Sequence, residues 1–482
     1  MRVHDPAVDA ERAHRRGGVL SAVPGKGLLR EMNVIVVVSD TFRYDYCGWN
    51  GNAWIRTPDL DRFAAGAVAF DRHYVSSFPT IPTRTDWFTA RFSFPTHGWR
   101  ALDPQVPVLA AALSRAGYLG QLIMDNPHMM KGTNNFDRGF EGACWLRGQE
   151  GDTYLTRVNR LHRTMPADKT RQKPQRHGYN LVDIHRTTNI DWAWEEDRFA
   201  ARTLRTASRW LEENYKAERF FLWVDCFDVH EPWDPPEYWV ERYNPGYVGP
   251  PMLHPNYGPA EIYSPAELAN LRAHYAGEVS MISRWFGRLL QKLEDVGLDD
   301  RTAVVFTSDH GMFLGEHNRT GKSNLWPGDA RRWPLYEEVA HIPLFMRVPG
   351  LAPRRVPALV QPPDLMPTLL DLAGVSAPPG VHGRSLLPLM RGEVQTHRTV
   401  AVSGAHGAQG AQVAVRDGRL SYYPEGEAGT PELYDTAADP AEARNLALSS
   451  PEDVGRLHSE LTRWMAEHGA AGPSLPAGAD WR

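Results

Sequence analysis

The feature that most constrains this 482-residue sequence is a pair of apolar runs that each end in acidic side chains. The runs are NVIVVVSD, residues 33–40, and TAVVFTSDHG, residues 302–311. Continuous apolar runs rich in β-branched residues are typical of parallel strands that are covered on both faces. Ligands bind at the carboxyl ends of such strands, so we expect Asp40, Asp309 and His310 to share one site.

The segments between these runs have helical periodicity. Apolar residues recur at helical spacing over residues 199–211 and again over residues 279–293, and each segment is followed by another apolar run. This alternation predicts an α/β fold with a large mixed, mostly parallel sheet sandwiched by helices. A Pro- and aromatic-rich stretch, residues 231–268, predicts a long ordered loop over the site.

The pattern changes after about residue 390. Short alternating runs surround the pair Asp417-Gly418, which indicates a hairpin, and a helix is expected from Pro451 with Ser450 as its N-cap. We therefore expect three parts. They are an N-terminal extension at 1–31, a catalytic α/β domain at 32–388, and a C-terminal subdomain at 389–482 with a small antiparallel sheet and a helix.

Charge and cysteine usage exclude several functions. There are 53 Lys and Arg against 58 Asp and Glu, a net charge of −5 without a long run of one sign, so we expect neither nucleic acid nor a membrane as partner. No run of about 18 apolar residues occurs, and residues 1–31 lack the apolar core of a secretory signal, so we expect a cytoplasmic protein. Cys47, Cys144 and Cys226 stand in unrelated contexts and are expected to be buried free thiols.

A third segment, SSFPTIPTRTDWFTAR at 76–91, offers a nucleophile. Pro82 near a helix start predicts that Thr80 lies in the preceding turn, where free N–H groups favour an anion. The Thr80 hydroxyl with Asp40, Asp309 and His310 would suffice as ligands for one divalent cation such as Ca²⁺, Mn²⁺ or Mg²⁺. Such an ion would hold the Thr80 oxygen as an alkoxide, and Arg84 could bond that oxygen or the ester oxygens.

These segments resemble the sulfatases of the alkaline phosphatase superfamily over residues 33 to about 446. Sulfatases typically carry C-x-P-S-R and a helix that ends in T-G-R, and this sequence is similar, with T-I-P-T-R at 80–84 and T-A-R at 89–91. Further motifs follow in the family's order: VVVSDTFRYDYCG, FFLWVDCFDVHEPW, TSDHGMFLGEH, DLMPTLLDLAG, HGRSLLPL and ELYDTAADPAEARNLA.

The resemblance implies an alkaline-phosphatase-like fold and a set of site residues. Asp40, Asp309 and His310 would be metal ligands, and Thr41 stands where many sulfatases place a second Asp ligand. The Asp-His pair is similar to the choline-sulfatase and phosphonate-monoester-hydrolase branch, which accepts Mn²⁺ as well as Ca²⁺. We therefore expect one Ca²⁺ or Mn²⁺ ion, with Mg²⁺ or Zn²⁺ less favoured.

Further residues are implied around the substrate. The resemblance places His230, His317 and Lys322 around the ester's anionic group, and either histidine would protonate the leaving oxygen. The family's G-K-W-H segment appears as D-N-P-H at 125–128, so that Asn126 or His128 would replace its Lys.

The nucleophile departs from the family. Sulfatases use a formylglycine made from Cys or Ser, and Thr80 cannot be converted, so no formylglycine is expected. A sulfated Thr lacks the second hydroxyl that expels sulfate by elimination, whereas Thr is the ordinary nucleophile of phosphodiesterase and phosphoryl-transferase branches of the superfamily.

Three functions are therefore compatible with the sequence. The first is a metal-dependent hydrolase that cleaves a small sulfuric, phosphate or phosphonate ester through metal-bound Thr80. The alternatives are a phosphodiesterase or a phospho- or sulfo-group transferase that uses Thr80, and a non-catalytic sulfatase-like binding protein. The oligomeric state is open, and a homo-oligomer is one of the states that the sequence allows.

Overall fold

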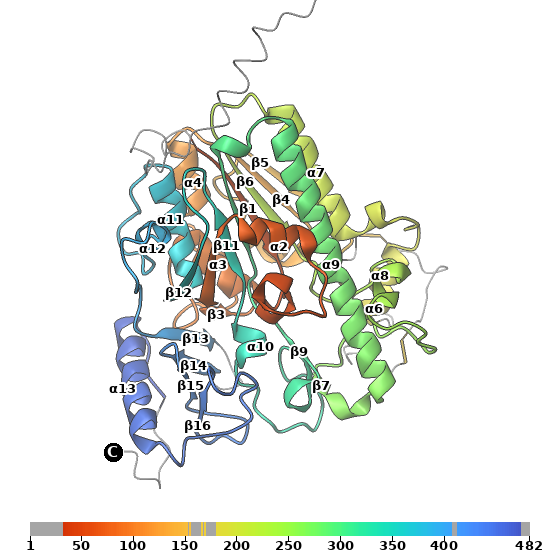
Figure 1. Cartoon of the computed structure of the whole chain (residues 1–482), viewed down its shortest axis with the longest axis vertical. Helices are drawn as coiled ribbons and strands as arrows, with labels where there is room; N and C mark the ends of the chain where they lie inside the picture. Colours follow the sequence, from red (N-terminus) through yellow and green to blue (C-terminus); the bar gives the residue numbers. More distant parts are fainter. Residues whose placement is uncertain are drawn as a thin grey trace, which may run out of the picture.

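The chain was analysed as a computed structural model. It describes residues 32–152, 154–155, 165–166, 168–169, 180–406 and 412–473, so the expected extension at 1–31 lies outside the described residues. Most of the chain forms an α/β body, and a smaller sheet lies at one end of it (Figure 1).

The central element is an eight-stranded sheet of mixed direction. All neighbouring strands pair in parallel except β11, which is antiparallel to both β8 and β2. Its strands, in spatial order, are β12 (Arg354–Val360), β2 (Val68–His73), β11 (Leu344–Arg347), β8 (Thr302–Thr307), β1 (Asn33–Ser39), β6 (Phe220–Cys226), β4 (Leu119–Met124) and β5 (Gly142–Trp145). The expected mixed, mostly parallel sheet is confirmed.

Helices cover both faces of this sheet because β1 is apolar on both faces. Ile35 and Val37 belong to one core, and Val34, Val36 and Val38 to the other. The first core is closed by α2 (Pro58–Ala65), α7 (Phe199–Asn214) and α9 (Pro265–Asp295). The second is closed by α3 (Thr80–Thr89), α4 (Leu109–Arg115), α11 (Leu365–Leu372) and α12 (Leu387–Met390) (Figure 1).

A five-stranded sheet forms the C-terminal part. In spatial order it consists of β16 (Glu432–Asp435), β15 (Leu420–Tyr423), β14 (Val413–Arg416), β13 (Ala401–Ala405) and β3 (Ser77–Phe78). The expected hairpin joins β14 to β15, and its Gly418 has a φ of 92°. The last strand, β3, comes from the segment just before Thr80 and pairs in parallel with β13. The small sheet therefore continues into the predicted nucleophile segment, and the domain boundary at residue 389 stays a prediction.

The closing helix is α13 (Pro451–Glu467), which packs on the small sheet as expected. Ser450 is the residue before its first turn, as expected, but the Ser450 side chain makes no capping hydrogen bond. Even α9, with 31 residues, does not combine length and apolar composition as a membrane-crossing helix would, and neither does any other helix described.

Short elements complete the fold. The stretch at 231–268 is ordered as expected, but it contains a short helix and a strand and ends in the first turn of α9. Within it lie α8 (Glu237–Glu241) and β7 (Gly258–Pro259). The other short helices are α5 (Pro127–Met130), α6 (Leu181–Thr188) and α10 (Glu337–Ala340), and β7 forms a three-stranded sheet with β10 (Arg319–Gly321) and β9 (Phe313–Leu314). All three cysteines are free as expected, although Cys144 is only partly buried.

Candidate active site

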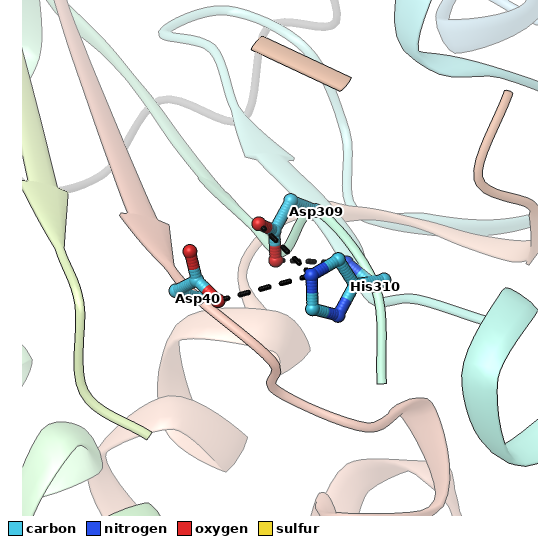
Figure 2. Close-up of side chains that lie close together, drawn as sticks. All are labelled: Asp40, Asp309 and His310. Carbon is cyan, nitrogen blue, oxygen red and sulfur yellow. Dashed lines mark hydrogen bonds and ion pairs between the residues drawn. The ribbon is translucent and has the colours of Figure 1, made fainter. Parts of the chain in front are cut away.

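Two acids and an imidazole meet at the carboxyl edge of the large sheet. Asp40 follows β1 and Asp309-His310 follows the neighbouring strand β8, so the parallel register brings them together. One ligand atom from each side chain lies within 4.8 Å of the others, and all three side chains are fully buried. Figure 2 shows the three side chains pointing toward one another. The juxtaposition expected from the two apolar runs is therefore present.

The Thr80 hydroxyl reaches this cluster. Its Oγ1 atom lies 3.3 Å from Nε2 of His310, whose Nδ1 faces the Gly311 carbonyl oxygen at 3.1 Å. Thr80 is the first residue of α3 rather than part of the preceding turn. The expectation that Thr80 precedes the helix is therefore wrong. Pro82 is the third residue of α3, and a proline is tolerated there because the N–H groups of the first turn have no partner within the helix.

Arg84 ties the acids together from one turn further along α3. Its Nη1 lies 2.7 Å from Asp309 Oδ2, its Nη2 lies 3.0 Å from Asp40 Oδ2, and Nη1 also donates to the Thr80 carbonyl oxygen at 3.0 Å. The Asp225 carboxylate in β6 accepts hydrogen bonds from Nη2 of Arg84 at 2.6 Å and from Nε at 3.1 Å. The guanidinium is fully buried and has carboxylates on three sides. In this arrangement it balances the charge of the acids and fixes the first turn of α3.

Thr41, Lys322 and Asn126 complete the polar shell. The Thr41 hydroxyl donates to Asp40 Oδ1 at 2.7 Å, and Lys322 Nζ lies 3.4 Å from the same hydroxyl. The Thr41 N–H donates to Asp309 Oδ1 at 2.9 Å. Asn126 Nδ2 lies 3.4 Å from Asp40 Oδ2. Thr41 therefore connects the two carboxylates, and its oxygen lies between the acidic and the cationic side of the site.

The two acids of the cluster, Asp40 and Asp309, differ in their pKa values. Burial and the charge of Asp309 raise the pKa of Asp40 well above its usual value. Burial acts on Asp309 too, but the neighbouring His310 and Arg84 outweigh it and hold its pKa below the usual value. Burial, with a further contribution from Lys322, lowers the pKa of His310 to about 3, so its imidazole is neutral at physiological pH.

These residues fit a divalent cation. The donor set is two carboxylates, one neutral imidazole nitrogen and nearby hydroxyl oxygens, which suits Ca²⁺ or Mn²⁺. The contact between Nδ1 of His310 and a backbone carbonyl leaves Nε2 as the lone-pair nitrogen that faces the acids, as is common for metal-binding histidines. The pKa of Asp40 is raised by burial and then by the charge of Asp309, and a dication beside both carboxylates would offset both causes.

The two other predicted histidines occupy different surroundings. His230 follows β6, is buried, and stacks on Phe227 with ring centroids 4.0 Å apart. Burial and the charge of Lys322 lower its pKa well below the usual value. His317 stacks on Tyr336, and its Nε2 lies 3.6 Å from Glu338. Among the hydrogen bonds, ion pairs and ring contacts found for the described residues, none joins His230 or His317 to the Asp40, Asp309 and His310 cluster, so both catalytic roles stay predictions.

Among the contacts found for the described residues, none joins His128 to Asp40 or Asp309. Its backbone N–H donates to the Asn126 side chain, its ring lies beside Phe227, and its Nε2 lies 3.3 Å from Glu150. Of the two residues expected to replace the family's Lys, Asn126 is thus the one whose side chain approaches Asp40.

The main residue that sequence reasoning missed is Asp225. It belongs to β6, pairs in register with Val38 of β1, and also accepts from the Trp223 indole at 3.2 Å. A signal was present, since an acid inside the apolar run FFLWVDCFD is costly unless a cation is buried with it. The sequence could not show that this cation is Arg84.

The fold and the cluster together define a class: an α/β protein with a buried acidic site at the carboxyl edge of its sheet. The family model for sulfatases matches residues 32–375, and the model for the C-terminal part of N-sulphoglucosamine sulphohydrolase matches residues 329–468. The chain belongs to the sulfatase family, as the motifs predicted.

Relatives align over nearly the whole chain. Arylsulfatase K of Rattus norvegicus is 26% identical over 461 residues, which cover 89% of this chain and 77% of the relative. Arylsulfatase of Clostridium perfringens is 27% identical over 470 residues, covering 88% and 92%. The solved structure of phosphonate monoester hydrolase from Agrobacterium radiobacter has the same fold, with a TM-score of 0.72, 23% identity, and coverage of 91% of this chain and 96% of that chain.

Proposed function

We propose that this protein hydrolyses small anionic esters of sulfuric, phosphoric or phosphonic acid with the Thr80 hydroxyl as nucleophile. The observation that carries the proposal is the position of Thr80 Oγ1, 3.3 Å from His310 Nε2, at the start of α3 and beside two buried carboxylates. An unmodified threonine in this position is a hydroxyl nucleophile that needs a nearby positive charge or a base.

The chain's own residues divide the first step between them. The Thr80 oxygen attacks sulfur or phosphorus in line as the bond from that atom to the leaving oxygen breaks, and the proton lost by the hydroxyl ends on the leaving oxygen, which departs as the alcohol. Arg84 keeps the first turn of α3 and the two acids in place during this step. Lys322, which points its ammonium at the Thr41 hydroxyl, supplies positive charge for the ester oxygens. A divalent cation held by Asp40, Asp309 and His310 would add positive charge beside both the hydroxyl and the ester oxygen.

The second step is the release of the group from Thr80 by water. The Nδ1 atom of His230 donates to the Glu231 carbonyl oxygen at 2.7 Å, so that Nε2 keeps its lone pair. The lowered pKa keeps this imidazole neutral, which makes it a base for the attacking water rather than an acid in the resting enzyme. Because Thr80 offers no second hydroxyl for elimination, release depends on attack at sulfur or phosphorus, and this favours phosphate and phosphonate esters.

The test is an ester screen with added Ca²⁺ or Mn²⁺ that compares an aryl sulfate, a phosphate diester and a phosphonate monoester. We expect turnover by the unaltered protein and a loss of at least about a thousandfold in Thr80→Ala. Thr85→Ala is the matched control, because the Thr85 hydroxyl of the same helix bonds only to the Ile81 carbonyl oxygen among the contacts described.

Each outcome of the screen selects one function. Turnover that is accelerated by an added alcohol, with transfer to that alcohol, would favour a group transferase. Absence of turnover for every ester would leave a sulfatase-like binding protein and overturn the hydrolase proposal. Full activity of Thr80→Ala would overturn the nucleophile.

A further inference from the structure

We propose that Glu231 is a positioning residue that holds His230 and Lys322 at a fixed separation around the bound oxyanion, an inference that rests on the proposed function. Glu231 directly follows His230 in the chain, and its side chain is fully buried. Among the contacts described, it touches neither Asp40, Asp309 nor Thr80, so it would act through His230 and Tyr257.

The first connection is to His230. The Nδ1 atom of His230 bonds to the main-chain carbonyl oxygen of Glu231 at 2.7 Å, and Oε2 of the Glu231 carboxylate lies 3.4 Å from the same nitrogen. The carbonyl oxygen accepts this proton and the negative charge of Oε2 attracts it, so both favour the proton on Nδ1 and therefore the lone pair on Nε2. Glu231 thus selects the tautomer in which His230 can act as a base.

The second connection runs through Tyr257, whose hydroxyl donates to Oε1 of Glu231. The Tyr257 carbonyl oxygen accepts from the Leu325 N–H at 3.0 Å, and Gly258 pairs with Thr320 in the small β7–β10 ladder. The residues on both sides of Lys322 are therefore attached to the segment that carries Tyr257.

Packing tightens this attachment at Gly321. A Cβ atom at Gly321 would lie 2.6 Å from the Tyr257 ring, so the backbone directly before Lys322 rests on that ring. Gly321 also has a φ of 98°, which an L side chain rarely adopts. A displacement of Tyr257 would therefore move the backbone of Lys322, whose ammonium lies at the Thr41 hydroxyl.

The cost of this arrangement points to a role beyond packing. Oε2 of Glu231 is buried and has no hydrogen-bond partner in the part of the chain that the structure describes. A buried carboxylate oxygen without a partner lowers stability, so a residue chosen only for packing would not carry one here. Its position beside Nδ1 of His230 gives it a function in the site.

The experiment is calorimetric titration of inorganic phosphate and of inorganic sulfate into the full-length protein with Ca²⁺ present. It compares the unaltered protein with Glu231→Ala, Lys322→Ala and the double variant. We expect Glu231→Ala to raise Kd about tenfold, and to change it less than about twofold when Lys322 is already absent, because linked residues are not additive. Glu231→Gln should restore most of the affinity, since its carbonyl oxygen can still accept from Tyr257.

Controls separate positioning from folding. Tyr263→Phe removes another buried hydroxyl of the same loop, one that bonds to the Asn256 N–H and the Lys169 carbonyl oxygen, and should leave Kd unchanged. Should Glu231→Ala fail to fold, Tyr257→Phe enters the same cycle with Lys322→Ala and should show the same coupling.

The outcomes also separate this inference from the proposed function. An unchanged Kd in Glu231→Ala, an equal loss with and without Lys322, or an unaltered protein that binds neither anion would overturn the positioning role. Coupled loss of anion binding in a protein that turns over no ester would uphold the positioning role and reject the hydrolase proposal.

Discussion

Replacing Arg84 with methionine tests how the acidic site is held together. Three fully buried carboxylates, those of Asp40, Asp225 and Asp309, share this one guanidinium at 3.0, 2.6 and 2.7 Å. Breaking one buried ion pair by removing a partner costs about 3–5 kcal/mol, and hydrogen bonds to charged groups contribute about 1.5–3 kcal/mol each. One carboxyl can take up a proton in the variant, since the pKa of Asp40 is already raised. This limits the loss, and we expect Arg84→Met to lower the free energy of unfolding by about 3–5 kcal/mol.

The assay is urea unfolding in the presence of a chelator, followed by titration of Ca²⁺. A dication can replace part of the missing positive charge, so added Ca²⁺ should stabilise Arg84→Met more than it stabilises the unaltered protein. Arg416→Met is the control: Arg416 is also buried and is paired with Glu337 at 3.1 Å, but it lies in the small sheet away from the acids. The stability that Arg416→Met loses should not be recovered by added Ca²⁺. A loss below about 1 kcal/mol for Arg84→Met, or equal Ca²⁺ effects on both variants, would show that Arg84 does not hold the three acids together.

Three further predictions concern the surroundings of the site. Burial raises the pKa of Asp86 to about 7 from 3.8, so native Asp86 holds a proton that the unfolded chain has lost, and stability should fall as pH rises from about 4 to 7. Urea unfolding should show that Asp86→Asn lacks this loss of stability, so that between pH 5 and pH 8 its free energy of unfolding rises by about 2–3 kcal/mol relative to that of the unaltered protein. Free energies of unfolding that change with pH in the same way in both proteins would contradict the buried proton. Gly321→Ala should lower stability by about 1–3 kcal/mol and weaken phosphate binding, because its new methyl group meets Tyr257; a neutral effect in calorimetry would contradict that contact. His230→Ala should reduce kcat at least about a hundredfold and His317→Ala less than about tenfold, and steady-state kinetics showing the reverse order would assign the base to His317.

The sequence predicted the fold because its signals were local. The runs at 33–40 and 302–311 are apolar on both faces, so their parallel pairing and burial follow from composition alone. The convergence of Asp40 with Asp309 and His310 follows from the same argument, since residues after neighbouring parallel strands meet at one edge.

The parts that sequence reasoning missed depend on long-range contacts. The partner of Asp225 is decided by how α3 crosses the sheet, and no local pattern encodes that. The two-residue strand β3 is too short for a periodic signal, yet it joins the small sheet to the segment before Thr80. The link from Glu231 through Tyr257 to the Lys322 backbone likewise spans distant segments.

Trapping the covalent intermediate tests directly whether Thr80 is the nucleophile. The full-length protein with Ca²⁺ or Mn²⁺ is mixed with the ester that it turns over fastest, quenched in acid within the first turnover, and digested for mass spectrometry. We expect one phosphoryl, phosphonyl or sulfo group on the peptide that contains Thr80, and none in Thr80→Ala. Turnover without any modification of that peptide, or modification of another residue, would contradict this role of Thr80.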